Sequence, residues 1–377
     1  MAVPKVPPRS DAVQIAGLLV SPEISQLVAE LAATRWTGRP GYPVRVMCGM
    51  ALTKSIYSLA TWTRTVGLVR EHAALRTAIG CPDPADVPSV HAVYRFSAKL
   101  RRFKPLLDAC LDRVTAALHE QLPELGTAIA VDASDMPAFG NGQRYLYRGG
   151  PERKRYSDPD ATWGHRSAVS TRSAGSFYGF KVHAAVCAVT GLPLAWTVET
   201  AKAQEATFAL PLLESVKERG FRPEVAVLDK GYDHTPVYVG FEARDCHPII
   251  PLRETPAVKA GKHKPPTCDH GEWTFAGSDA KRQAAKWRCP TGACAPASTW
   301  VGASRLHTLI PRGTPRWRTL YRQRGSVERE FGQLKHEWAL LPLRIRGIER
   351  VRLHADLTIL AQLACALAKA RAVPLAA

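Results

Sequence analysis

The chain of 377 residues carries 51 Lys and Arg against 33 Asp and Glu, which gives a formal net charge of +18. This length supports a sizeable core and more than one domain, and the positive charge favours a polyanionic partner, above all nucleic acid. The sequence has no run of about 18 apolar residues and no apolar signal-peptide centre near its start, so we expect a cytoplasmic protein without a membrane segment. Nine cysteines in so long a chain indicate no disulfide framework.

Residues 1–122 are expected to form an all-helical N-terminal domain. Apolar residues recur there at helical spacing, clusters of Pro and Gly separate the periodic stretches, and Ser89 is placed to cap a helix. The expected helices span 22–34, 44–57, 59–69, 71–79, the residues after Ser89, and 106–122. A plain packing domain and a DNA-binding domain both fit this pattern. A local basic cluster favours DNA; it contains Arg95, Lys99, Arg101, Arg102 and Lys104.

Two short apolar runs each end in an aspartate. Residues 128–131 lead into Asp132, and residues 225–228 lead into Asp229. Runs this short, rich in β-branched residues and bounded by turn formers, predict buried strands. An acid just past a buried strand is a usual way to place a ligand at a sheet edge, although a single such Asp more often marks only a turn or a helix cap.

A long polar stretch, 139–176, follows the first of these strands. It is rich in arginine, including Arg144 and Arg148, and tyrosine and tryptophan side chains are interleaved with the basic ones. Structureless segments of this length are uncommon and usually functional, and basic residues mixed with aromatics suit a nucleic-acid contact. A solvated loop without function is the alternative.

The segments that follow alternate between strand and helix patterns. Residues 177–189 and 194–199 predict a hairpin, 205–219 a helix, and 247–251 a further strand, so the order is that of an α/β protein. In the first of these strands, alternation places Lys181 and His183 on one side, and we expect that side to face the acidic residues.

Residues 252–320 interrupt this order and are expected to form an inserted β-rich subdomain. The segment is basic, contains Pro and Trp, and lacks a helical period. It includes Cys268, His270, Cys289 and Cys294, whose Cys-x-His and Cys-x4-Cys spacings have the composition of a tetrahedral zinc site. The spacing is looser than in a paired Cys-x2-Cys array, so a small sheet with reduced thiols stays an alternative.

The stretch from Tyr321 to Leu341 predicts one amphipathic helix. Its apolar stripe contains Val327, Phe331, Leu334, Trp338 and Leu341. A second face carries one acid, Glu328, among Tyr321, Arg324 and Lys335. One carboxylate beside cationic groups suits metal and phosphate chemistry, although a solvated helix face would also carry such charges.

The spacing Tyr-x2-Arg-x3-Glu-x6-Lys resembles the YREK signature of bacterial insertion-sequence DDE transposases. The two strand-end acids, Asp132 and Asp229, and the helix acid Glu328 are similar to the DDE triad of these enzymes, in the same order. The resemblance implies a ribonuclease H-like catalytic domain, formed by 123–251 and 321–372, with the helical domain 1–122 before it and the insertion 252–320 before the last catalytic helix.

The resemblance also implies a chemistry and partners. The three acids would bind two Mg²⁺ ions, for which Mn²⁺ may substitute, and the ions would activate the nucleophile and stabilise the leaving oxygen. Tyr321, Arg324 and Lys335 would position phosphates of double-stranded DNA, with Arg144 and Arg148 as further contacts. We expect a homodimer on transposon ends and target DNA. A ribonuclease H-like host nuclease and a domesticated DNA-binding copy without cleavage are the alternatives.

Overall fold

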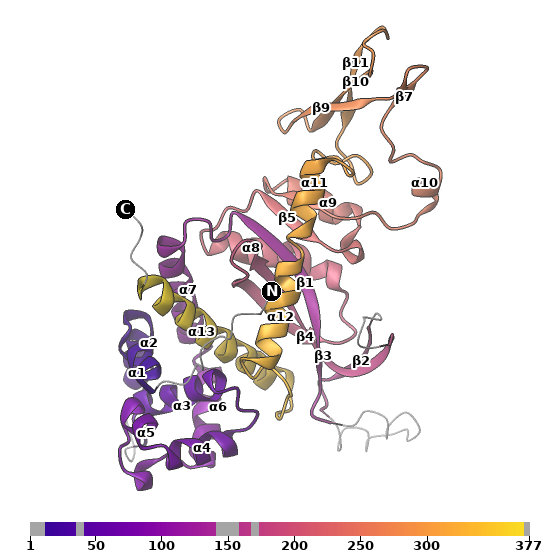
Figure 1. The fold of residues 1–377 in the computed structure, drawn as a ribbon. Coiled ribbons are helices and arrows are strands. Elements are labelled where there is room, and N and C mark those ends of the chain that lie inside the picture. Colours follow the sequence, from indigo (N-terminus) through magenta and orange to yellow (C-terminus); the bar gives the residue numbers. More distant parts are fainter. Residues whose placement is uncertain (1–11, 35–40, 141–157, 167–172, 373–377) are drawn as a thin grey trace, which may run out of the picture.

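The computed structural model describes residues 12–34, 41–140, 158–166 and 173–372. Figure 1 shows three groups of elements: helices of the N-terminal part in indigo and purple, a central sheet with its helices, and an outlying group of short strands in orange. The predicted α/β architecture, with a helical region ahead of the sheet and a β-rich insertion, is confirmed.

The N-terminal helices follow the predicted apolar periodicity. Ser89 caps its helix as expected, because its side-chain oxygen accepts a hydrogen bond from the Ala92 amide at 3.2 Å. The helices are α1 (Ala12–Val20), α2 (Pro22–Ala33), α3 (Val44–Ile56), α4 (Trp62–Glu71), α5 (Ala73–Ile79), α6 (Val90–Arg102) and α7 (Lys104–Gln121). Helix α1 was not among the predicted helices; tertiary packing stabilises it, since Ile15, Leu18 and Leu19 are all buried.

A six-stranded sheet forms the centre of the molecule. Strand β1 (Ala128–Pro137) runs antiparallel to β3 (Gly175–Cys187), which is antiparallel to β4 (Pro193–Thr200). On its other side β1 is parallel to β5 (Val225–Leu228), and β5 is parallel to β6 (His247–Ile249). Three antiparallel strands followed by two parallel ones, in the order β4-β3-β1-β5-β6, are the topology of a ribonuclease H-like core.

One strand was not predicted. Strand β2 (Thr162–Arg166) lies within the stretch expected to be a polar loop and pairs with the first residues of β3. Gly164 makes this possible by its lack of a side chain, since a Cβ there would come within 2.4 Å of the Ala201 carbonyl oxygen. Residues 141–157 and 167–172 of the polar stretch, including Arg144 and Arg148, lie outside the described residues.

Helices cover both faces of the sheet. The α13 helix (Ile348–Ala372) is held to one face by Asp356, which accepts a hydrogen bond from the Trp196 indole at 2.8 Å. The α12 helix (Gly325–His336) packs on β1 and β3. On the other face, His183 stacks on Phe208, directly ahead of α8 (Ala209–Glu218). A further helix, α9 (Thr235–Glu242), packs beside α8 and β6.

The helix predicted to start at Tyr321 is in two pieces, so that prediction is wrong in part. Helix α11 (Pro315–Arg322) ends before Gln323 and Arg324, and α12 begins at Gly325. Both linking residues keep right-handed helical dihedral angles, so the two helices nearly continue one another (Figure 1). The predicted apolar stripe is confirmed by the burial of Val327, Phe331, Leu334 and Trp338, although Trp338 lies past the helix end.

One large apolar core joins the N-terminal helices to the sheet, and a smaller cluster, mostly of sheet residues, packs against α11. Helix α13 forms the connection, because it packs against α3, α7 and β4. Its length and composition would allow it to cross a membrane, and 72% of its most apolar window is buried inside the protein, as in a core helix. The bent pair α1 and α2, at 68°, passes the same test together. The division at residue 122 stays a prediction.

The insertion is an outlying subdomain of short strands, as predicted. It contains α10 (Pro256–Lys259) and the strands β7 (Thr267–Cys268), β8 (Gly271–Glu272), β9 (Thr274–Asp279), β10 (Ala284–Arg288) and β11 (Ser298–Gly302). Two arginines fix it to the core: Arg305 pairs with the buried Asp233 at 3.0 Å, and Arg312 donates to the Ile250 carbonyl at 2.8 Å. The boundary expected at residue 320 falls within α11 and also stays a prediction.

Candidate active site and metal centre

The two strand-end aspartates lie side by side in the sheet. The last pair between the parallel strands β1 and β5 joins Val131 to Leu228, so Asp132 and Asp229 follow at the same edge. Asp229 also caps a short 3-10 turn, 230–232, in which its carboxylate accepts from the Gly231 amide at 2.5 Å. A Cβ on Gly231 would lie 2.6 Å from that carboxylate oxygen, which explains the glycine after the second acid.

Arg324 brings the third acid to this edge. Its guanidinium donates to Asp132 Oδ2 at 3.0 Å and to Glu328 Oε1 at 2.6 Å. Arg324 stands at the start of α12, and Glu328 is in the first turn of that helix. The Asp132 side chain is 14% exposed and that of Glu328 is 59% exposed, so the group is open to solvent on the Glu328 side.

Burial perturbs the ionisable groups at this edge. Burial raises the pKa of Asp132 to about 7; the Arg324 charge opposes this rise, and the charges of Asp229 and Glu205 add to it. Burial, followed by the charges of Asp132, Glu205 and Asp229, also raises the pKa of the buried Tyr232 phenol well above its usual value. Carboxylate oxygens gathered at one edge are the donor set that suits Mg²⁺ or Mn²⁺.

Lys335 reaches the same edge from the other end of α12. Its ammonium group donates to the Ser134 hydroxyl of β1 at 2.6 Å. Ser134 was not predicted, although it lies two residues after Asp132 and therefore shares a face with it. Tyr321 lies in α11, where its ring stacks on Trp317 at 4.9 Å between centroids, and burial raises the pKa of its phenol. Four predicted residues of the two helices thus extend along one side of β1.

The predicted placement of Lys181 and His183 is wrong. His183 lies directly opposite Ala133 in β1, whereas Asp132 lies opposite Ala184, so His183 and Lys181 point to the other face of the sheet. Lys181 donates there to Glu205 at 2.5 Å. Glu205 was not predicted as a site residue, because the short 3-10 turn that contains it, 205–208, has no recognisable sequence motif.

The N-terminal basic cluster is divided in its contacts. Lys99 donates to the Leu31 carbonyl at 2.7 Å, and Lys104 pairs with Asp356 at 3.2 Å, so both serve packing. Arg95 and Arg101 instead line a cavity between the N-terminal helices and α13.

The four zinc-ligand candidates converge in the insertion. Their ligand atoms all lie within 4.8 Å of one another. Cys268 Sγ is 3.8 Å from Cys289 Sγ, and His270 Nδ1 is 3.9 Å from Cys268 Sγ and 3.7 Å from Cys294 Sγ. Zn–S bonds of about 2.3 Å in a tetrahedron separate the sulfurs by about 3.8 Å. The geometry therefore fits a tetrahedral zinc ion. Cys268, Cys289 and Cys294 are all free thiols, so no disulfide joins them.

Two family profiles match the chain one after the other. The profile described as "Transposase domain (DUF772)" matches residues 3–99, and the one described as "Transposase DDE domain" matches residues 123–363. The chain belongs to the DDE transposase family. The transposase is accordingly a polynucleotidyl transferase that serves DNA transposition, as its sequence motifs predicted.

Among solved structures, the transposase is similar to one described as the cryo-EM structure of the piggyBac transposase synaptic complex with hairpin DNA. The match has 11% sequence identity and a TM-score of 0.44, and it covers 97% of this chain and 77% of that chain. A likeness at this level carries no argument about function. No curated protein matches the chain.

Proposed function

We propose that this transposase binds the inverted repeats of a bacterial insertion sequence and catalyses metal-dependent DNA cleavage and strand transfer at them. It would act as a homodimer on double-stranded DNA in the cytoplasm, on transposon ends and then on target DNA. The observation that carries the proposal is the convergence of Asp132, Asp229 and Glu328 at one sheet edge, where Arg324 is hydrogen-bonded to two of them.

Asp132, Asp229 and Glu328 are the proposed metal ligands. Mg²⁺ or Mn²⁺ held by these carboxylates would supply the Lewis acidity that in-line phosphoryl displacement needs. Burial raises the pKa of Asp132, so ionising its carboxylate costs free energy in the free protein. A bound cation would offset that cost. The exposed Glu328 side chain lies on the side from which DNA can approach.

Arg324, Lys335 and Tyr321 are the proposed phosphate-positioning residues. In the free protein Arg324 partly neutralises Asp132 and Glu328. When cations neutralise these acids, the planar guanidinium becomes available to grip a phosphate with two donors. Lys335 would hold a neighbouring phosphate as a point charge, with Ser134 orienting its ammonium group. Arg144 and Arg148 stay proposed DNA contacts.

The test is cleavage of a linear duplex that carries the element's inverted repeats. Asp132→Ala, Asp229→Ala and Glu328→Ala should each abolish Mg²⁺-dependent cleavage and retain DNA binding, whereas Glu337→Gln, at the end of α12, serves as a matched control and should cut normally. If any one of the triad variants cut at the wild-type rate, that residue would not be a ligand. Cleavage that ignores the repeats would favour a host nuclease, and binding without cleavage by the wild type would favour a domesticated copy.

We also propose that Cys268, His270, Cys289 and Cys294 hold a structural zinc ion. The ion would join the β7–β8 hairpin to the loop between β10 and β11. Among the described residues of 267–302, the buried apolar side chains are few: Ala284, Ala285, Trp287 and Cys289. A unit of fewer than about 40 residues with so small a core usually needs a metal or disulfides to fold.

Metal analysis tests the zinc proposal independently of cleavage. Purified, reduced protein should carry about one zinc per chain, and Cys289→Ser should lose it and make the insertion sensitive to protease. Cys246→Ser replaces a buried free thiol outside the cluster and should retain the metal. Folded, reduced wild-type protein without zinc would rule the site out.

A further inference from the structure

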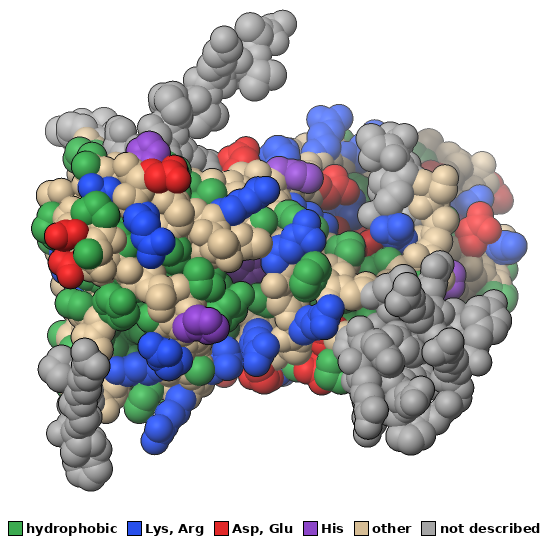
Figure 2. Space-filling view, turned by 90° about the horizontal axis from the view of Figure 1, so that it is seen from below, with side chains coloured by type: hydrophobic (Ala, Val, Ile, Leu, Met, Phe, Trp, Pro, Cys, Tyr) green, Lys and Arg blue, Asp and Glu red, His purple; other side chains and the backbone are tan. Residues whose placement is uncertain are grey.

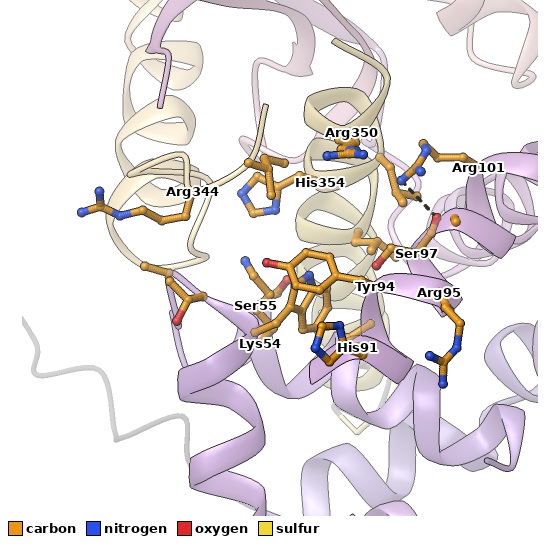
Figure 3. Close-up of a pocket in the computed structure, with 18 residues that line it drawn as sticks. Lys54, Ser55, His91, Tyr94, Arg95, Ser97, Arg101, Arg344, Arg350 and His354 are labelled. Carbon is orange, nitrogen blue, oxygen red and sulfur yellow. Dashed lines mark hydrogen bonds between the residues drawn. The ribbon is translucent and has the colours of Figure 1, made fainter. Parts of the chain in front are cut away.

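A cavity of about 490 Å³ lies where the N-terminal helices meet the end of the chain. Its walls come from α3, from the start of α4, from α6, from residues 344–345 and from α13 (Figure 3). The volume falls in the range of small-molecule and cofactor sites, about 300–1,000 Å³. The cavity contains none of the three acids, and the proposed chemistry does not use it.

The charged residues among those that line this cavity are all basic, and none of the described lining residues is Asp or Glu. The charged ones come from three helices and one connecting segment: Lys54, Arg95, Arg101, Arg344 and Arg350, with the histidines His91 and His354. In Figure 3, Lys54 and His354 point toward each other across the cavity, and Arg344 and Arg95 extend outward at its two ends.

Lys54 is the strongest indication of a ligand. The residue is 6% exposed, and lysine is almost never buried to this extent without a partner. No carboxylate among the described residues pairs with its ammonium group, whose closest aromatic neighbour is the Trp62 ring, 5.6 Å away at the centroid. A buried cation aimed into an acid-free cavity lacks a counter-charge that an anion would supply.

The other cations are also crowded together. Burial lowers the pKa of Arg101, and the neighbouring Arg350 lowers it further. Burial and the Lys54 charge lower the pKa of His354 to about 3. The Glu349 charge acts on Arg101 in the opposite direction and raises its pKa. Glu349 lies outside the cavity lining, however, and forms a salt bridge with Arg352 at 2.8 Å. The positive groups therefore repel one another in the free protein.

The remaining wall is apolar and aromatic. Trp62 and Leu353 are buried beside Lys54, and Tyr94 stands 48% exposed at the opening. Cations combined with aromatic rings are what a nucleotide needs, since the phosphate binds the former and the base or sugar packs on the latter. An inorganic anion alone would leave the apolar wall unused.

We propose that this cavity is a second DNA-contact site, which takes a backbone phosphate on Lys54, Arg101 and Arg350 and the adjoining sugar or base against Trp62. The inference rests on the proposed DNA binding and deepens it. Seen from below, on the side of the N-terminal helices, Lys and Arg side chains are spread across the middle of the face with histidines among them (Figure 2). Such a surface suits a long polyanion better than a free nucleotide.

The experiment is equilibrium binding of a duplex of about 20 base pairs at several salt concentrations. Lys54→Met should weaken binding about tenfold and reduce the slope of log affinity against log salt by about one unit, because one condensed phosphate contact is lost. Arg101→Gln combined with Arg350→Gln, at the cavity opening, should act in the same direction if Lys54→Met does not fold. As the matched control, Lys369→Met removes one exposed lysine charge from α13, which also forms a cavity wall, at a position that does not line the cavity.

The outcomes separate this site from the proposed function. If Lys54→Met weakens binding no more than Lys369→Met does, the cavity is not a phosphate site, while cleavage of transposon ends by the wild type would leave the proposed function standing. If the wild type binds no DNA, the proposed function and the DNA ligand both fail. Thermal stabilisation by inorganic phosphate, lost in Lys54→Met, would then identify a site for free anions and overturn the assignment to DNA.

Discussion

Replacing Lys54 by Met is expected to stabilise the ligand-free protein, which is the opposite of what the loss of a structural lysine does. Lys54 is 6% exposed, and burial lowers the pKa of its ammonium group from 10.5 to about 8. At about 1.4 kcal/mol per pKa unit, this lowering corresponds to roughly 3 kcal/mol against the charged form. Methionine fills a similar volume without charge. After a loss of about 0.5–1 kcal/mol for the contact with Trp62, the free energy of unfolding near pH 7 should rise by about 2–3 kcal/mol.

This gain should shrink as the pH rises from about 8 to 10.5. In that window the unfolded chain keeps the Lys54 proton and the folded chain releases it, so the wild type gains stability relative to the variant. Urea unfolding of both proteins at about pH 7 and about pH 9.5 measures the difference, and other titrating groups cancel. Lys369→Met, exposed on α13, is the control and should differ from wild type by less than about 0.5 kcal/mol at both. The reasoning is refuted if Lys54→Met is less stable near pH 7, or if the difference does not change with pH.

Two further predictions concern the acidic edge, and a third concerns the attachment of the insertion. Because burial raises the pKa of Asp132 to about 7, protons should compete with Mg²⁺, and calorimetry should show the affinity falling about tenfold per pH unit below that value; a pH-independent affinity would contradict this. Lys335→Ala and Arg324→Ala should each flatten the salt slope of DNA binding by about one unit and slow cleavage beyond the binding loss, whereas Glu337→Gln should do neither. Asp233→Asn should lower the free energy of local unfolding of the insertion by about 3 kcal/mol, because Arg305 loses its buried charged partner. An unchanged rate of proteolysis between residues 252 and 314 would contradict this prediction.

Most of the fold could be predicted because its elements carry strong local signals. The N-terminal helices have clear apolar periods, and the strands that end in Asp132 and Asp229 are short apolar runs with turn formers after them. Strand β2 could not be predicted, because Trp163 is the one large apolar residue in Thr162–Arg166 and the strand depends on pairing with β3. Helix α1 was missed for a related reason: its apolar residues gain order only from packing on other helices.

The residues of the candidate site were predicted from the sequence, but their positions relative to one another were not. The break at Gln323 and Arg324 was not visible, since neither residue is a helix breaker. Gln323 and Arg324 nevertheless keep helical dihedral angles, so Arg324 and Glu328 stay on one face, as predicted, and form a hydrogen bond. Alternation gave the side of β3 that Lys181 and His183 share, but the register with β1, which decides the face, is set by tertiary pairing.

Two largely buried ionisable side chains of opposite charge, Asp132 and Lys54, each lower the stability of the ligand-free protein. Burial opposes the ionisation of Asp132 at one end of the sheet, where Arg324 compensates only in part, and the ionisation of Lys54 between α3 and α13. In a fold selected for stability alone, each would be replaced by a neutral residue of similar size, at a gain of a few kcal/mol. Each position is understandable if a ligand supplies the missing charge, a divalent cation for Asp132 and a phosphate for Lys54. A DNA strand bound at both places would have its scissile phosphate at the acids and a distant nucleotide at the N-terminal helices, which accounts for a single core that holds these two regions together through α13.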